Sequence, residues 1–183
     1  MINWNTNGDY PQVNDTACIH PTAVIIGNIK IGKNVFVGPG AVIRADESGS
    51  SITVQDNCNI QDRVVIHALE ASSVLIKENT SLAHGCIVHG PCKIGKDSFV
   101  GFGSVVFNAD IDEGVCIKHL AVVEGVTVQS EKIIESHSLI DCKEDVLKLR
   151  RTDKKHKKFM EKVVEVNLSF AKGYNNEQSG FFR

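Results

Sequence analysis

Aliphatic residues recur every six positions along most of the chain. The main series is Ile19, Ile25, Ile31, Val37, Ile43, then Val54, Ile60, Ile66, then Ile76, Leu82, Val88, Ile94, Val100, Val106. A weaker series continues to about Val128. A period of six matches neither the helical period nor plain strand alternation, and it is typical of a parallel β-helix built from hexapeptides. We therefore predict a mainly β fold in which three hexapeptides form one triangular coil.

Two segments interrupt this period. Residues 44–51 (RADESGSS) insert five residues, and residues 68–73 (ALEASS) insert four. After each interruption the six-residue period resumes, so both segments are predicted to be loops that leave an otherwise regular coil. Loops on a rigid scaffold are where functional groups tend to lie.

The two ends of the chain have a different pattern. Residues 1–12 are polar and predict an N-terminal arm, so residues 1–130 are expected to form the β-helix domain. Residues 131–183 are expected to form a linker and an amphipathic α-helix that packs on it, with Thr152 or Asp153 as N-cap and Gly173 as its end. The basic run KKHKK (154–158) is most simply a solvated first turn, because no aromatic residue is interleaved for stacking on bases.

The composition of the chain limits the binding partners and the cellular compartment that we expect for the protein. A chain of 183 residues can bury one substantial core, and its formal charge of -2 gives no global attraction to nucleic acid or membranes. The sequence shows no transmembrane span or signal peptide, so a cytoplasmic location is expected. The six cysteines form no C-x-x-C pair and are expected to be reduced thiols, several of them in the core.

Arg44, His67 and His89 share one position in the repeat. Residues 18 apart stack on the same face of successive coils, about 4.8 Å from each other. His67 and His89 are 22 apart, which is 18 plus the four-residue insertion, and Arg44 precedes His67 by 23, which is 18 plus the five-residue insertion. The spacing therefore predicts a single ladder of these three side chains.

His84 lies on another side of the coil, stacked on Asp62, so it is not expected to reach the ladder of its own chain. Threefold symmetry would bring His84 of one chain to the ladder of the next, giving three equivalent sites. Three imidazoles with an open fourth position are the ligands of a catalytic zinc site, and they also suit Fe²⁺ or Co²⁺. Ordinary hydrogen-bonded surface or interface histidines are the alternative.

Five strings resemble the γ-class carbonic anhydrase family of trimeric left-handed β-helices. They are IRADE (43–47), NIQD (59–62), VVIHALE (64–70), SLAHGCIVHG (81–90) and VNLSFAKGY (166–174). The left-handed winding is implied by this resemblance alone. The chain resembles a short-loop form, since His67 and His84 are only 17 residues apart where other members carry a long acidic loop.

The resemblance implies the roles of the site residues. The metal ligands fall on His67 and His89 of one chain and His84 of the next. The inter-subunit ion pairs of the family fall on Arg44, Asp46 and Asp62. Arg44 and Asp46 could equally hold a trimer together and support catalysis only indirectly.

Four further positions match polar residues of the family's active site. Gln61 matches the residue that hydrogen-bonds a metal-bound hydroxide, and Asn167 matches an asparagine near the substrate pocket. An interhelical hydrogen bond is the alternative for Asn167. Glu47 and Glu70 match acidic positions and are candidate proton acceptors, although either could be a loop charge without a role.

The implied activity is the reversible hydration of carbon dioxide to bicarbonate by a metal-bound hydroxide at the interfaces of a homotrimer. A hexapeptide acyltransferase is the first alternative, because that class shares the fold and uses a histidine as general base. It needs one histidine and gives no reason for the stacking of His67 and His89. A metal-binding protein of this fold without turnover is the second alternative.

Overall fold

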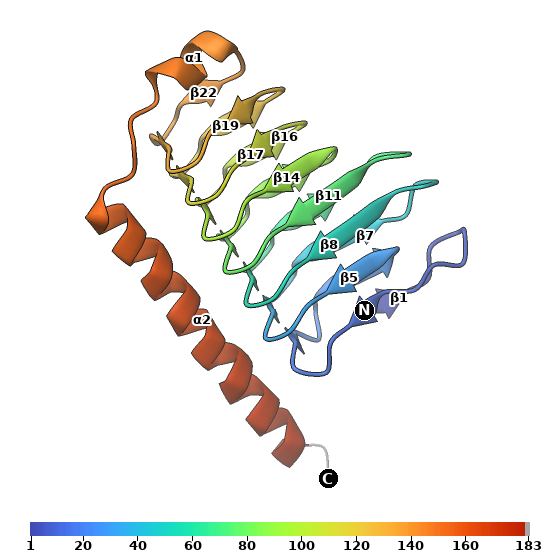
Figure 1. The fold of residues 1–183 in the computed structure, drawn as a ribbon. Helices are drawn as coiled ribbons and strands as arrows, with labels where there is room; N and C mark the ends of the chain where they lie inside the picture. The colour runs from blue at the N-terminus through green and yellow to red at the C-terminus, as the bar shows by residue number, and fades with distance from the viewer. Residues whose placement is uncertain (182–183) are drawn as a thin grey trace.

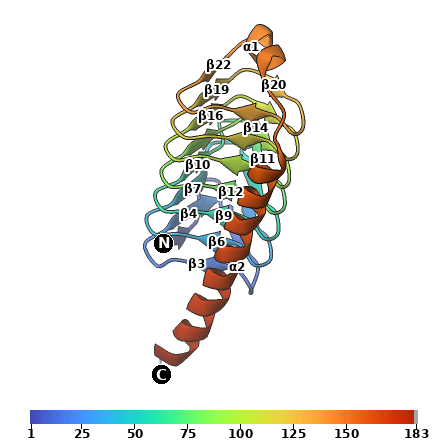
Figure 2. The same ribbon diagram turned by 90° about the vertical axis from the view of Figure 1, so that its left-hand side faces the viewer.

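The chain forms a left-handed parallel β-helix with a long C-terminal helix, as predicted, and a short helix that was not predicted lies between them (Figures 1 and 2). A computed structural model describes the backbone of residues 1–181 and the side chains of residues 1–174. Strands of two to four residues make the three sides of each triangular coil, and strands on one side of successive coils pair in parallel. The three resulting sheets are called A, B and C here.

The strand order in each sheet follows the coils. Sheet A consists of β1 (Ile2–Asn3), β4 (Val24–Gly27), β7 (Val42–Ala45), β10 (Val65–His67), β13 (Ile87–His89), β16 (Val105–Phe107), β19 (Val122–Glu124) and β22 (Leu139–Ile140). Sheet B consists of β2 (Gln12–Val13), β5 (Ile29–Ile31), β8 (Ser51–Val54), β11 (Ser73–Ile76), β14 (Cys92–Ile94), β17 (Asp110–Ile111) and β20 (Thr127–Val128). Sheet C consists of β3 (Cys18–Ile19), β6 (Phe36–Val37), β9 (Asn59–Ile60), β12 (Ser81–Leu82), β15 (Phe99–Val100), β18 (Cys116–Ile117) and β21 (Ile133–Ile134).

The six-residue aliphatic series forms the core. In sheet A, Ile25, Ile43, Ile66 and Val88 pair in register from coil to coil, and all four side chains are fully buried. Burial of each such side chain contributes about 1.5–3 kcal/mol. Because every coil contributes equivalent positions, the stack fixes the register of the whole solenoid, including the residues that follow each aliphatic position.

The corner between sheets B and C carries a ladder of asparagines. Asn34, Asn57, Asn79 and Asp97 all have positive φ values of 54–60°, which Asn and Asp tolerate better than most residues. The side-chain amide of Asn34 donates to Asn57 (3.1 Å), that of Asn57 to Asn79 (3.2 Å), and that of Asn79 to Asp97 (3.0 Å). Each tight turn is thereby bonded to the turn of the next coil.

The first residues belong to the solenoid, which corrects the prediction of a separate N-terminal arm. Strand β1 pairs with β4, and β2 pairs with β5. Asn5 has only 9% exposure, and its side chain donates to the Ala45 carbonyl and accepts from the backbone N–H groups of Asn7 and Asp9. Polar side chains thus hold this coil where the aliphatic period is missing.

The solenoid also continues past residue 130. Strands β21 and β22 complete a further coil before α1 (Lys143–Lys148) and α2 (Lys154–Phe181). Asp153 caps α2, as predicted, because its carboxylate accepts from the backbone N–H groups of Lys155 and His156 at 2.9 Å each. Gly173 does not end α2, which continues to Phe181.

Helix α2 runs down sheet C, antiparallel to the direction in which the coils advance (Figures 1 and 2). Met160 packs near the last coils with Phe99, whereas Ala171 packs near the first coils with Cys18 and Phe36. Over residues 1–181, neither helix is long and apolar enough to cross a membrane.

The cysteines are free thiols, and all but Cys142 are buried, as several were predicted to be. Burial raises the pKa of Cys58, Cys86 and Cys92 to about 12. These thiols therefore act as small core hydrophobes.

Candidate metal centre

The predicted ladder exists at the corner between sheets A and B. Arg44 on β7 pairs in register with His67 on β10, and His67 pairs with His89 on β13. His67 Nδ1 lies 3.0 Å from His89 Nε2. The two imidazoles are in contact because the number of residues between them and the pairing of the buried aliphatic residues place them at the same position of neighbouring coils.

His67 has a polar atom without a partner. Its side chain is 14% exposed, and Nε2 lies 3.4 Å from Asp46 Oδ1 and 3.5 Å from Glu47 Oε1. Nε2 and Asp46 Oδ1 are both buried and have no hydrogen-bond partner among the described residues. Unsatisfied buried polar atoms are rare and call for an explanation. The ring nitrogens of His67 and His89, with these carboxylates beside them, are donor types that a divalent transition metal takes.

The first insertion loop supplies the charges around His67. Partial burial would raise the pKa of Asp46, but the hydrogen bond and positive charge of Arg44 outweigh it, and the pKa is lowered. Arg44 Nη2 lies 2.9 Å from Asp46 Oδ2 within one chain. Glu47 Oε2 accepts a 2.6 Å hydrogen bond from the backbone N–H of Glu70, so the two insertion loops are joined.

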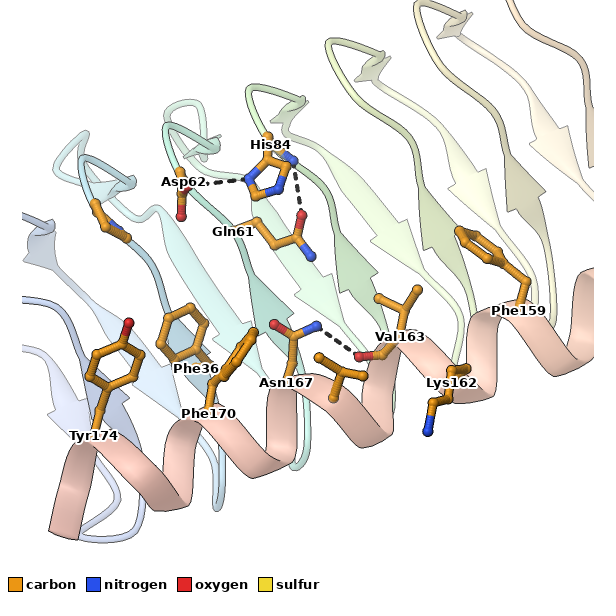
Figure 3. Close-up of a pocket in the computed structure, with 12 residues that line it drawn as sticks. Phe36, Gln61, Asp62, His84, Phe159, Lys162, Val163, Asn167, Phe170 and Tyr174 are labelled. Atoms are coloured by element: carbon orange, nitrogen blue, oxygen red, sulfur yellow. Dashed lines mark hydrogen bonds and ion pairs between the residues drawn. The ribbon is translucent and has the colours of Figure 1, made fainter. Parts of the chain in front are cut away.

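His84 lies at the corner between sheets C and A, as its place in the repeat predicted (Figure 3). Its Nδ1 is 3.4 Å from Asp62 Oδ2, and its backbone N–H donates to Gln61 Oε1 at 3.3 Å. Its ring is stacked on Phe102, with centroids 5.4 Å apart. The imidazole is 54% exposed in the single chain, so its position leaves room for a second ligand-bearing surface.

A pocket of about 480 Å³ joins His84 to helix α2 (Figure 3). Gln61, Asp62 and Asn167 line it on the polar side. Asn167 is 7% exposed and donates from Nδ2 to the Val163 carbonyl at 2.7 Å, so this bond lies within α2. The apolar side, which the sequence did not predict, consists mainly of Phe36, Phe159, Phe170 and Tyr174.

The site residues therefore form two groups. Arg44, Asp46, Glu47, His67, Glu70 and His89 lie at the A–B corner, and Gln61, Asp62, His84 and Asn167 lie at the pocket. His84 and His89 are at opposite ends of one side of the triangle, separated by strand β13, whose three residues span about 10 Å. Two nitrogens on one zinc ion lie within about 4 Å of each other. One chain cannot place all three histidines on one ion.

One other cluster brings three ligand-type side chains together. Among residues 1–174, Asp141, Cys142 and Asp145 have possible ligand atoms within 4.8 Å of one another. Cys142 Sγ contacts Asp145 Oδ2 at 3.1 Å, at the start of the six-residue helix α1. This contact accounts for the cluster without an ion.

Comparison with known proteins identifies the family. The chain is 34% identical over 192 aligned residues to the carbonic anhydrase of Methanosarcina thermophila, and the alignment covers 93% of this chain and 77% of that protein. The chain belongs to the γ-class carbonic anhydrase family.

A repeat family and a second relative also match the chain. The family described as bacterial transferase hexapeptide (six repeats) matches residues 10–45 and 73–108, and leaves out the region between them that holds most of both insertions. The carboxysome assembly protein CcmM of Nostoc sp. is 34% identical over 181 residues. That alignment covers 93% of this chain and 32% of CcmM, so the chain spans about a third of this relative's length.

A solved structure has a similar fold. The hexapeptide transferase family protein of Anaplasma phagocytophilum is 28% identical, with a TM-score of 0.81, and the match covers 95% of this chain and 98% of that one. The β-helix and its C-terminal helix are therefore shared with proteins that carry a different functional name.

Proposed function

We propose that the protein catalyses the reversible hydration of carbon dioxide to bicarbonate, with a divalent metal held by His67 and His89 of one chain and His84 of the next. The observation that carries this proposal is the contact between His67 and His89, combined with the buried and unpartnered Nε2 of His67. Membership of the γ-class carbonic anhydrase family supports the same reaction. Zinc is the default metal, and Fe²⁺ or Co²⁺ fit the same nitrogen ligands.

The positions of the three histidines along the β-helix axis support a trimer whose threefold axis is parallel to the β-helix. His67 ends β10, His84 precedes β13 and His89 ends β13, so the three histidines lie within two neighbouring coils. A neighbour that supplies His84 to the ladder must therefore be related by a rotation about an axis parallel to the coil axis, without a shift along it. Repeating one such rotation closes a ring, and three triangular subunits form a threefold ring with three equivalent sites.

The residues around the ligands have separate roles in this proposal. When bound, a divalent metal held by three imidazoles lowers the pKa of a coordinated water to about 7 and so supplies a nucleophile. The Gln61 carbonyl is engaged by the His84 backbone N–H, which leaves the amide N–H groups of Gln61 to orient a substrate oxygen. Asn167 has its amide bonded within α2, so its carbonyl oxygen is the group available to the pocket.

The two glutamates are not equivalent as proton acceptors. Glu47 accepts a hydrogen bond from the Glu70 backbone and lies against His67, so we assign it to holding the loop and the imidazole. Glu70 has an exposed side chain in the second insertion loop. An exposed carboxylate exchanges protons with buffer, and Glu70 is the better candidate for passing them to solvent.

Acyl transfer is the second candidate, favoured by the likeness to the hexapeptide transferase family protein. An acyltransferase of this fold needs one histidine as general base and no metal. Stacked His67 and His89 would then have no function. Removal of the metal should abolish carbon dioxide hydration and leave acyl transfer unchanged, so the two candidates can be separated on one protein sample.

The test combines metal analysis with stopped-flow carbon dioxide hydration on protein reconstituted without oxygen. His67→Ala, His84→Ala and His89→Ala should each reduce bound metal well below one ion per chain and abolish hydration. His137→Asn is the matched control, because His137 is exposed, distant in the repeat and has a φ of 62° that Asn tolerates. Full metal content in all three alanine variants would exclude the proposed site.

A further inference from the structure

The chain has a strongly basic segment at residues 143–158. This segment contains eight Lys and Arg residues and three Asp and Glu residues, for a formal charge of +5. The whole chain has a charge of -2, so the remaining residues carry -7. The charge of the protein is therefore divided between one short basic segment and an acidic remainder.

The basic segment covers the C-terminal end of the β-helix. Helix α1 lies beyond β22, and Arg151 forms an antiparallel bridge with Lys132 beside the last strand of sheet C (Figures 1 and 2). The segment then turns into the first turn of α2, where Lys157 pairs with Glu131. All eight basic side chains are exposed. Those of α1 lie at the end of the solenoid, and those at the start of α2 lie beside sheet C near the last coils (Figures 1 and 2).

Several of these charges have no carboxylate partner. Lys148, Arg150 and Lys157 form ion pairs, with Asp145, Glu135 and Glu131 respectively. Among residues whose side chains the structure describes, the lysines of the segment without an ion pair are Lys143, Lys154, Lys155 and Lys158. Unpaired lysines that lie close together, as Lys154, Lys155 and Lys158 do at the start of α2, are free to attract an anionic surface.

The position of the lysines argues against a role in helix stability. The first turn of α2 contains no acidic residue, and Lys154, Lys155, Lys157 and Lys158 lie in its first five positions. The N-terminus of a helix is the positive end of its dipole, so cations there are destabilising and acidic residues are favoured. A cluster of lysines at this end costs stability, and an anionic ligand would reverse that cost.

We propose that the basic segment binds the anionic headgroups of a lipid bilayer, with the protein lying on the membrane surface. Clusters of four to eight Lys and Arg on an amphipathic helix favour anionic lipids. Leu147, at 71% exposure in α1, lies among these charges and can enter the headgroup region. Residues 143–158 contain no Phe, Tyr or Trp for stacking on bases, which disfavours single-stranded nucleic acid as the partner.

The threefold assembly proposed above would strengthen this binding, although the proposal does not depend on it. An axis parallel to the β-helix places the C-terminal ends of all three solenoids, and so all three basic segments, toward the same end of the trimer. Linked binding sites act together because the second and third contacts become intramolecular. Neither the metal ligands nor the pocket lies in this segment, so membrane binding and hydration can fail independently.

The test is sedimentation of the full-length protein with vesicles of phosphatidylcholine alone or with about 30% phosphatidylglycerol. Wild-type protein should sediment with the anionic vesicles and not with the neutral ones, and it should be released by raised salt. The variant Lys154→Gln/Lys155→Gln/Lys158→Gln should bind at least about tenfold more weakly. Leu147→Ser should weaken binding to the vesicles less than the triple substitution does, and it should not weaken any binding to duplex DNA.

A matched control has three other exposed lysines replaced, Lys30→Gln, Lys33→Gln and Lys172→Gln. It carries the same change in net charge and should bind as wild type does. Circular dichroism and carbon dioxide hydration should be unchanged in both triple variants. The proposal is overturned by equal loss in the control, by no binding at low salt, or by duplex DNA competing for the segment more tightly than vesicles do.

Discussion

The imidazole of His84 is stacked on the phenyl ring of Phe102, with the ring centroids 5.4 Å apart and 26° between the planes. The other partner of Phe102 is His119, at 4.3 Å and 10°. Asp62 contacts His84 Nδ1 from the neighbouring coil. The ring of a proposed metal ligand is thus fixed by an aromatic partner on one side and a carboxylate on the other.

We therefore expect Phe102→Ala to weaken metal binding without unfolding the protein. Removing a group that orients a ligand typically costs about 10–100-fold in metal affinity. Competition with a chelator gives the affinity, and the Co²⁺ absorption spectrum reports the ligand geometry. Phe102→Tyr should restore both, because it keeps the stacked ring, and Leu139→Ala provides an exposed control of similar size. Equal affinities for Phe102→Ala and wild type would contradict the positioning role.

The shared site predicts complementation between inactive chains. His67→Ala chains keep His84, and His84→Ala chains keep the ladder, so mixed trimers contain some interfaces with all three ligands. Those interfaces should bind metal and hydrate carbon dioxide, giving activity that neither parent has. Mass measurement confirms mixing. Mixed trimers with only parental activity would show that the ligands do not come from two chains.

The unequal environments of the glutamates predict different buffer responses. Glu70→Gln should slow hydration at low buffer concentration, and added imidazole should restore it, because the buffer then carries the proton. Glu47→Gln keeps a group that can accept the Glu70 N–H but loses the charge beside His67. It should reduce hydration at every buffer concentration. Rescue of both variants would mean that neither carboxylate is structural.

Thiol reactivity tests the packing of the solenoid. Burial raises the pKa of Cys58, Cys86 and Cys92 to about 12 and that of Cys116 to about 11, so at pH 8 these groups are thiols without solvent access. A disulfide reagent should modify only Cys142 in the native protein and all six cysteines after denaturation. Cys142→Ser should then give no native reaction. Fast native labelling of several thiols would show a looser core.

The ladder was predictable from the sequence because the register is counted along the chain. Once the insertions are known to be five and four residues, the residue count alone places Arg44, His67 and His89 at equivalent positions of successive coils. The aromatic wall of the pocket was not predictable in this way. This wall depends on the rotation of α2 about its own axis. Phe159, Phe170 and Tyr174 are exposed on α2, whereas a second line of apolar residues on the same helix packs on sheet C.

Prediction failed where other interactions replace the aliphatic period. The first coil is held by the side chain of Asn5 and by two-residue strands, which are too short to show a period. Gly173 was predicted to end α2, yet the helix continues to Phe181. Glycine in a helix interior costs only about 1 kcal/mol relative to alanine, which does not by itself end a helix.

The asparagine ladder limits how the solenoid can grow by duplication of a coil. Asn34, Asn57 and Asn79 each donate a side-chain amide hydrogen to the turn of the following coil, and the series ends at Asp97, whose carboxylate only accepts. A duplicated coil inserted between Asn34 and Asn79 brings a new asparagine that both accepts and donates, so the series continues. Beyond Asp97 the same corner continues with Gly114 and Glu131 at the positive-φ position, so those coils are added without a side-chain amide in the series. The ladder itself can therefore be lengthened by a coil inserted before Asp97, whereas a coil copied beyond Asp97 would lengthen the solenoid without lengthening the ladder.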